Sequence, residues 1–278
     1  MPRMSHACTV VQCYNSGDMA KAKQNSDELI IPQARTNLPV SIRVGLAILL
    51  PVFISLIVTG LTGNVSGLGQ ATNSAPFLAG VGIVSWVLAL FWYGLANVGM
   101  RGKRPLFAGI GFATLGWVTF LLFRAIFLPI DVQQGESARA FVYILLFQAF
   151  ATQLWTFGVI FRSVAEWRGP LTGAFVSGVI FGGAAFVLFQ ESYLTDLFSL
   201  LYFILWGVFY GIIRLRTGSF LGVFIIQTMQ SFTAWVVLGA YTPDTPASQL
   251  YLVYGLSGIA YLIFIWRLWP KVVSDYRV

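Results

Sequence analysis

Eight long apolar segments constrain the fold of this sequence more than any other feature. Each holds roughly 20 mostly apolar residues, which is the length that an α-helix needs to cross a bilayer. Lipid cannot satisfy an unpaired backbone, and we find no ten-residue alternating strands of the kind that build membrane barrels. The sequence therefore predicts an all-α, polytopic membrane bundle of about eight transmembrane helices. The segments cover approximately residues 42–62, 77–99, 105–128, 138–160, 170–190, 193–212, 218–240 and 249–269.

Composition agrees with a protein that lies in a lipid bilayer. The chain is 57% hydrophobic and only 10% charged, far from the composition of a soluble domain. Its formal net charge of +7 would suit a nucleic-acid partner, but the basic residues lie in short loops between apolar segments. We therefore expect a bilayer as the environment and no nucleic acid as a partner.

The loop charges also predict an orientation. Of the 17 Lys and Arg residues, 15 fall on one side of the predicted bundle, and the loops on the other side are neutral or acidic. Because positive loops face the cytoplasm, both termini are expected to be cytoplasmic. Arg139 and Arg124 are the exceptions, and we expect Arg124 to extend to the outer interface. The host membrane is expected to be a plasma (inner) membrane or a thylakoid-type membrane.

The predicted bundle is one domain between two polar ends. Residues 1–41 are expected to form a solvated, mobile tail, residues 42–270 the transmembrane domain and residues 271–278 a short cytoplasmic tail. The potential metal ligands His6, Cys8 and Cys13 have irregular spacing, so we predict no metal site and no cofactor.

Polar residues inside the predicted spans indicate which helix faces look into the bundle. Spacings of three and four place Gln227, Gln230 and Ser231 on one helical face. Such a face forms either interhelical hydrogen bonds or a substrate site. In the fifth predicted span, small residues recur every fourth position at Ala174, Gly178 and Gly182, and this pattern predicts the close approach of another helix.

Familiar hydrolytic sites are not found in this sequence. The chain has no histidine after His6, which excludes an HExxH zinc motif and a serine protease with a histidine base in the membrane. No aspartate falls in the interior of a predicted span, since Asp196 lies at the outer end of the sixth. Glu166 and Arg168 are charged residues at the expected entrance of the fifth span. They are either interfacial anchors or part of a site.

Two stretches resemble one known family. AEWRGPLTGAFVSGVIFGGAAF, residues 165–186, is similar to the segment of the CAAX prenyl protease and bacteriocin-processing family that reads Glu-Glu-x-x-x-Arg-Gly and continues to Phe-x-x-x-His. GVFYGIIRLRTGSFLGVFIIQTMQS, residues 207–231, resembles the later segment that leads to His-x-x-x-Asn. The resemblance covers roughly residues 138–240. It implies an eight-helix intramembrane endopeptidase in which a glutamate activates water with the help of histidines, and an asparagine stabilises the oxyanion.

The framework residues of the family are present here, but its chemical residues are replaced. Arg168 and Gly169 match the end of the first motif, and Phe181 matches the aromatic position of the second. The matches to the chemical positions are then Ser163 and Val164 for the glutamate pair, Ala185 and Gln227 for the two histidines, and Ser231 for the asparagine.

These replacements favour a member of the family that has lost its catalytic activity. Glutamine does not titrate near neutral pH and is a poor transition-metal ligand, and serine cannot act as a general base. The leading hypothesis is a binding, scaffold or assembly factor for an unidentified membrane protein, with Arg168, Phe181, Gln227, Gln230 and Ser231 lining the inherited cavity. An endopeptidase with an atypical site built on Glu166 and Arg168 is the alternative, and a small-molecule or lipid carrier is a weaker one.

Overall fold

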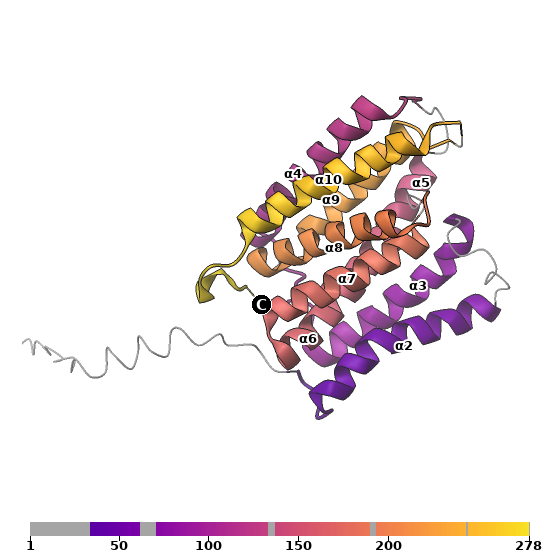
Figure 1. Ribbon diagram of the computed structural model, residues 1–278. Helices are drawn as coiled ribbons and strands as arrows, with labels where there is room; N and C mark the ends of the chain where they lie inside the picture. The colour runs from indigo at the N-terminus through magenta and orange to yellow at the C-terminus, as the bar shows by residue number, and fades with distance from the viewer. Residues whose placement is uncertain (1–33, 62–70, 133–136, 190–192, 243, 278) are drawn as a thin grey trace, which may run out of the picture.

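The computed structural model describes residues 34–61, 71–132, 137–189, 193–242 and 244–277, and every regular element within them is helical (Figure 1). The predicted all-α class is therefore confirmed. Most of the expected mobile tail lies outside the described residues. The α-helices are α2 (Val40–Leu61), α3 (Ala71–Leu88), α4 (Arg104–Phe127), α5 (Ser137–Tyr143), α6 (Phe161–Arg168), α7 (Pro170–Leu188), α8 (Leu197–Thr217), α9 (Leu221–Ser231) and α10 (Ala247–Leu268).

Each predicted span contains a helix, and seven of these helices are long and apolar enough to cross a membrane. The helix of the seventh predicted span, Leu221–Val237, is apolar but shorter than the others. It consists of α9 and the π-helical turn Phe232–Val237. The chain is an integral membrane protein, and the orientation of its termini stays a prediction.

The fourth span is longer than predicted, because its helix runs from Ala138 to Arg168 and ends at Gly169. Gly169 has a φ of 93°, a conformation that favours glycine, and Pro170 then begins α7. Glu166 and Arg168 therefore lie in the last turns of this helix, and the prediction that they open the following span is wrong. Hydropathy placed the end of this span too early, because the side chains of Arg162 and Glu166 are charged but lie almost fully buried in the bundle.

This long helix, which we call the central helix, is the most enclosed part of the bundle. In its most apolar stretch 78% of the residues are buried, compared with 22% for α4. It contacts α2, α3, α7 and α9. Its middle contains two π-helical stretches, Ile144–Ala151 and Leu154–Ile160. Thr152, between the two stretches, and Thr156, in the second, donate side-chain hydrogen bonds to the carbonyls four residues earlier, a pattern that bends helices.

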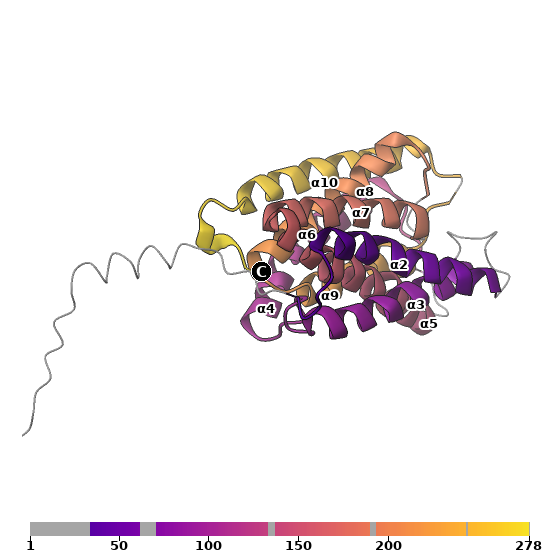
Figure 2. The ribbon, with the colours of Figure 1, turned by 90° about the horizontal axis from the view of Figure 1, so that it is seen from below.

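Helices α7 and α8 lie side by side in both ribbon views and meet backbone to backbone (Figure 1, Figure 2). A Cβ atom on Gly178 would lie 2.7 Å from the Cα of Val208, and one on Gly182 would lie 2.5 Å from the Cα of Ile204. On α8, a Cβ atom on Gly207 would lie 2.1 Å from the carbonyl oxygen of Gly178. The predicted close approach of a helix to the small residues of α7 is therefore confirmed.

Most of the described basic residues gather at one end of the bundle, where α2, α4, α7 and α9 begin and where α3, the central helix, α8 and α10 finish. We call this the basic end. Its members are Arg35, Arg43, Arg101, Lys103, Arg104, Arg162, Arg168, Arg214, Arg216, Arg267, Lys271 and Arg277.

Arg124, at the opposite end, does not extend to the interface as predicted. Its side chain is only 1% exposed. The guanidinium donates to the carbonyl oxygens of Ala234, Pro129, Leu238 and Gly239 at 2.9–3.0 Å. These carbonyls follow α4 and lie in and just after the helix Leu221–Val237, where backbone acceptors would otherwise lack partners. Burial of Arg124 is thus compensated by hydrogen bonds that hold two helix ends together.

Candidate functional site

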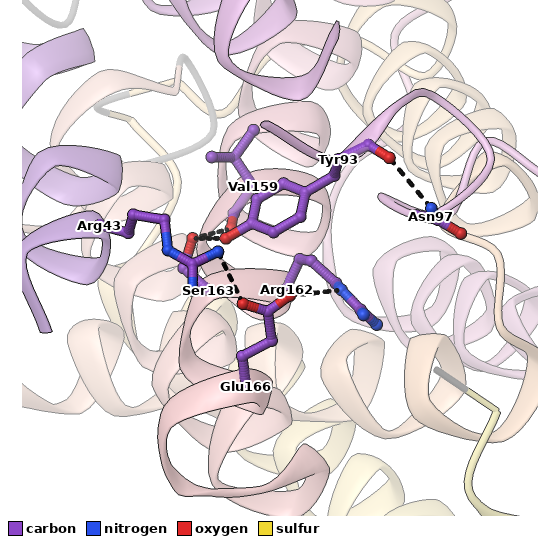
Figure 3. A network of polar contacts seen from close by, with 7 residues as sticks. All are labelled: Arg43, Tyr93, Asn97, Val159, Arg162, Ser163 and Glu166. Atoms are coloured by element: carbon purple, nitrogen blue, oxygen red, sulfur yellow. Dashed lines mark hydrogen bonds and ion pairs between the residues drawn. The ribbon is translucent and has the colours of Figure 1, made fainter. Parts of the chain in front are cut away.

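A cluster of polar side chains surrounds Ser163, the residue expected to match the first family glutamate (Figure 3). Ser163 is fully buried in the central helix and donates to the carbonyl oxygen of Val159 at 2.9 Å. Its only hydroxyl proton is used in that bond. The Tyr93 hydroxyl, 2.9 Å from Ser163 Oγ, is therefore the donor of the second bond.

Two arginines hold Glu166 one turn further along the central helix. Arg43 Nη1 of α2 lies 2.8 Å from Glu166 Oε2, and both side chains are 6% exposed. Arg162 Nε lies 3.6 Å from the other carboxylate oxygen of Glu166. The two residues form an i,i+4 pair in which the arginine side chain is fully buried. The guanidinium carbons of Arg43 and Arg162 are each 5.9 Å from the centroid of the Tyr93 ring. We call Arg43, Tyr93, Arg162, Ser163 and Glu166 the Ser163 cluster.

The geometry of this cluster suits helix association better than acid–base chemistry. Ion pairs and hydrogen bonds of the cluster connect the central helix to α2 and also to the helical turn that carries Tyr93. Glu166 is the only carboxylate in the cluster, and its charge is compensated by two guanidinium groups.

A second polar group, formed by Gln148, Gln153 and Gln227, lies in the middle of the bundle. Gln227 of α9 accepts a hydrogen bond from Gln153 Nε2 at 2.5 Å and donates to the carbonyl oxygen of Gln148 at 3.4 Å. All three side chains are at most 1% exposed. Gln153 precedes Ser163 by ten residues of the central helix. The residues that match the glutamate and the second histidine thus have separate partners.

The other two predicted site residues of α9 are also buried. Gln230 lies between the hydroxyls of Tyr210 and Tyr261, at 3.4 and 3.3 Å, so it faces α8 and α10 rather than the central helix. It lines a cavity of only about 10 Å³, roughly the space of one water molecule. Ser231 is 1% exposed, and its hydroxyl has no hydrogen-bond partner among the residues that the structure describes. The predicted common face is therefore divided between two sides of α9.

Phe181 and Arg168 differ most from the predicted cavity lining. Phe181 is fully buried among aromatic rings, with centroids at 5.4 Å from Phe157 and 5.5 Å from Trp206. It fills the core. Arg168 is exposed and lies over the ring of its neighbour Trp167 at 4.6 Å. The expected place of Arg168 in an interior cavity is therefore corrected, because the chain turns at Gly169 and leaves its side chain on the surface.

Sequence reasoning missed three members of the Ser163 cluster: Arg43, Tyr93 and Arg162. Only Arg162 had a usable signal, because Arg162 and Glu166 have the i,i+4 spacing of a helical ion pair. Arg43 and Tyr93 lie 70 or more positions from the central-helix residues that they contact.

Comparison with protein families links this geometry to the resemblance described above. Residues 134–233 match the family model described as type II CAAX prenyl endopeptidase Rce1-like. The matched region contains the central helix, α7, α8 and α9. This match supports the CAAX protease-like family for residues 134–233. Searches of curated proteins and of solved structures gave no match.

The donor groups of the described residues do not fit a catalytic metal ion. Within the described residues, no three His, Cys, Asp or Glu side chains come together. The groups at the positions expected to match the family's histidines are the Gln227 amide and the methyl group of Ala185, and neither is a good ligand for a transition metal. No chemical step is therefore assigned to a metal ion here.

Proposed function

We propose that this CAAX protease-like protein is a non-catalytic member of its family that acts as a binding, scaffold or assembly factor for other membrane proteins. The observation that carries the proposal is the state of Ser163. At the position that matches the family's glutamate, a hydroxyl donates its proton to its own helix and accepts from Tyr93. Such a group neither accepts a proton from water nor lies free to attack a peptide.

Two further features support the loss of catalysis. Glu166, the nearest carboxylate in sequence, is paired with Arg43 and Arg162. The Gln227 amide is bonded to the central helix inside the bundle, and the cavity lined by Gln230 has no room for a peptide. A partner would therefore meet the outer surface of the bundle instead of the inherited cavity, which modifies the expectation from sequence.

The decisive test is a cleavage assay on the full chain reconstituted in lipid. A library of prenylated and unmodified membrane peptides is incubated with the wild type, with Glu166→Gln and with Asp244→Asn, which changes an exposed carboxylate. We expect no cleavage above an empty-liposome background by any of the three. Removing an acid–base group costs on the order of 10²- to 10⁴-fold. Cleavage by the wild type and Asp244→Asn that Glu166→Gln abolishes would instead establish the atypical endopeptidase.

The binding function is tested separately by purification of the tagged protein from its native membrane in mild detergent. Mass spectrometry then quantifies co-purifying proteins and bound metals. We expect a stoichiometric membrane-protein partner and no stoichiometric transition metal. A bound metal with only transient, processed partners would contradict the proposal and favour the peptidase.

A further inference from the structure

A basic cleft lies outside both polar clusters, at the basic end of the bundle. It has a volume of about 260 Å³ and is formed by the first turns of α4, the last turn of α8 and the segment that follows α10. Its charged lining consists of Arg104, Arg216, Arg277 and Asp275. None of these residues belongs to the region around Ser163 or to the glutamine group.

The segment after α10 is fastened in place, so the cleft is a built feature. The Arg277 backbone N–H donates to the carbonyl oxygen of Leu215 at 2.9 Å, and the buried Arg214 donates to the Arg277 carbonyl at 3.4 Å. Asp275 accepts from the Lys271 N–H at 2.9 Å and forms an ion pair with Arg216. These contacts close a turn that positions Arg277 opposite α8.

The charges of the cleft are only partly balanced. The Asp275 carboxylate pairs with Arg216 and accepts hydrogen bonds from the turn. These contacts, above all the hydrogen bond from the Lys271 N–H, hold the pKa of Asp275 below its usual value. Within the described ranges, neither Arg104 nor Arg277 pairs its side chain with a carboxylate. With three arginines and one aspartate, the lining carries a net charge of +2. Paired guanidinium groups are well suited to bind the oxygens of a phosphate.

One wall of the cleft is apolar and continues along α4. Arg104, Ala108 and Phe112 line the cleft at four-residue intervals, so they form one stripe of the helix. The distance from Arg104 to Phe112 along the axis is about 12 Å. Further along α4, Leu115 is 51% exposed. A ligand with an anionic head at the helix ends and an apolar body along a membrane helix matches this arrangement.

We propose that this cleft binds an anionic phospholipid, with the phosphate held by Arg104 and Arg277 and an acyl chain lying along the Ala108–Phe112 stripe of α4. The basic end lies at the limit of the apolar helices, where lipid headgroups are found. Clusters of basic residues at such positions attract anionic headgroups. The binding site is independent of any peptidase activity.

The experiment uses the purified full chain and native mass spectrometry, with phosphatidylglycerol compared with phosphatidylcholine of the same acyl chains. The wild type is expected to retain one phosphatidylglycerol per chain, about tenfold more tightly than phosphatidylcholine, since charge-assisted hydrogen bonds are strong. Arg104→Gln combined with Arg277→Gln is expected to abolish this preference. Arg267→Gln, which changes another exposed arginine of the basic end outside the cleft, should keep it.

Two further measurements distinguish lipid binding from binding of the phosphate group alone. Phe112→Ser should weaken retention of phosphatidylglycerol, and inorganic phosphate in excess should not fully displace the lipid. Equal retention of the two lipids, loss of the preference in Arg267→Gln as well, or complete displacement by inorganic phosphate would each overturn the proposal. If the double variant melts below the wild type, Arg104→Gln alone serves as the test, because its side chain is exposed.

Discussion

The α7–α8 contact and the Ser163 cluster are both buried helix contacts, but the first is formed by backbone atoms and the second by polar side chains. Between α7 and α8, glycines allow two backbones to touch, and the contact depends on the absence of side chains. In the Ser163 cluster, long polar side chains reach across from α2 and from Tyr93 to the central helix. Packing of small residues depends on shape alone, whereas the polar cluster depends on each charge and proton having a partner.

The largest effect is expected where a side chain would enter the backbone contact. Gly178→Val would place its Cβ 2.7 Å from the Cα of Val208, and backbone cannot move aside as a flexible side chain can. We expect destabilisation of roughly 3 kcal/mol, as for severe overpacking, measured by thermal unfolding in detergent. Gly183→Val is the matched control on the same helix, because its Cβ would have no neighbour within 4 Å. Equal loss of stability in both variants would show that the loss comes from helix propensity and not from the backbone contact.

A smaller but clear effect is expected from removing the only carboxylate of the Ser163 cluster. Glu166→Gln leaves Arg43 and Arg162 near each other without a counter-charge. Breaking one side of a fully buried pair costs 3–5 kcal/mol, and partial access of water to Glu166 reduces our expectation to about 2 kcal/mol. Unfolding in detergent should show this loss, and Asp244→Asn should leave stability unchanged.

A double-mutant cycle with Arg43→Met distinguishes a true ion pair from two independent effects. The loss in the double variant is expected to be smaller than the sum of the single losses, because the second substitution removes a charge that the first left uncompensated. Additive losses would mean that Arg43 and Glu166 stabilise the bundle separately, and the cluster would then not join α2 to the central helix.

The difference between the two regions also explains how far sequence could predict this molecule. The apolar segments and the recurrence of Ala174, Gly178 and Gly182 are local patterns, and they predicted the spans and a close helix contact. The length of the central helix was missed because Arg162 and Glu166 resemble the end of a span until their partners are known. Arg124 was missed for the same reason, since its four carbonyl acceptors include three more than 100 positions away.

The identity of the candidate site residues stays a prediction, and their geometry could not be predicted. The match to the CAAX protease-like family covers the region of Ser163, Phe181 and Gln227. Whether a selected residue faces a cavity depends on what fills the space, and neighbouring aromatic rings fill it around Phe181. The free volume beside a residue depends on how side chains from several helices pack together, and no periodicity along one segment encodes it.

The smallest effect is expected from a single hydroxyl in the same cluster. Tyr93→Phe keeps the ring near both guanidinium groups but removes the donor to Ser163 Oγ. Ser163 still donates to Val159, so only one lone pair loses its partner, and we expect a loss of about 1 kcal/mol in thermal unfolding. Ser163→Ala removes the same bond from the other side and should cost a similar amount, with little further loss in the double variant. Fully additive losses would mean that the two hydroxyls stabilise the bundle through different partners, and the bond at the family's glutamate position would then not account for the stability of this end of the bundle.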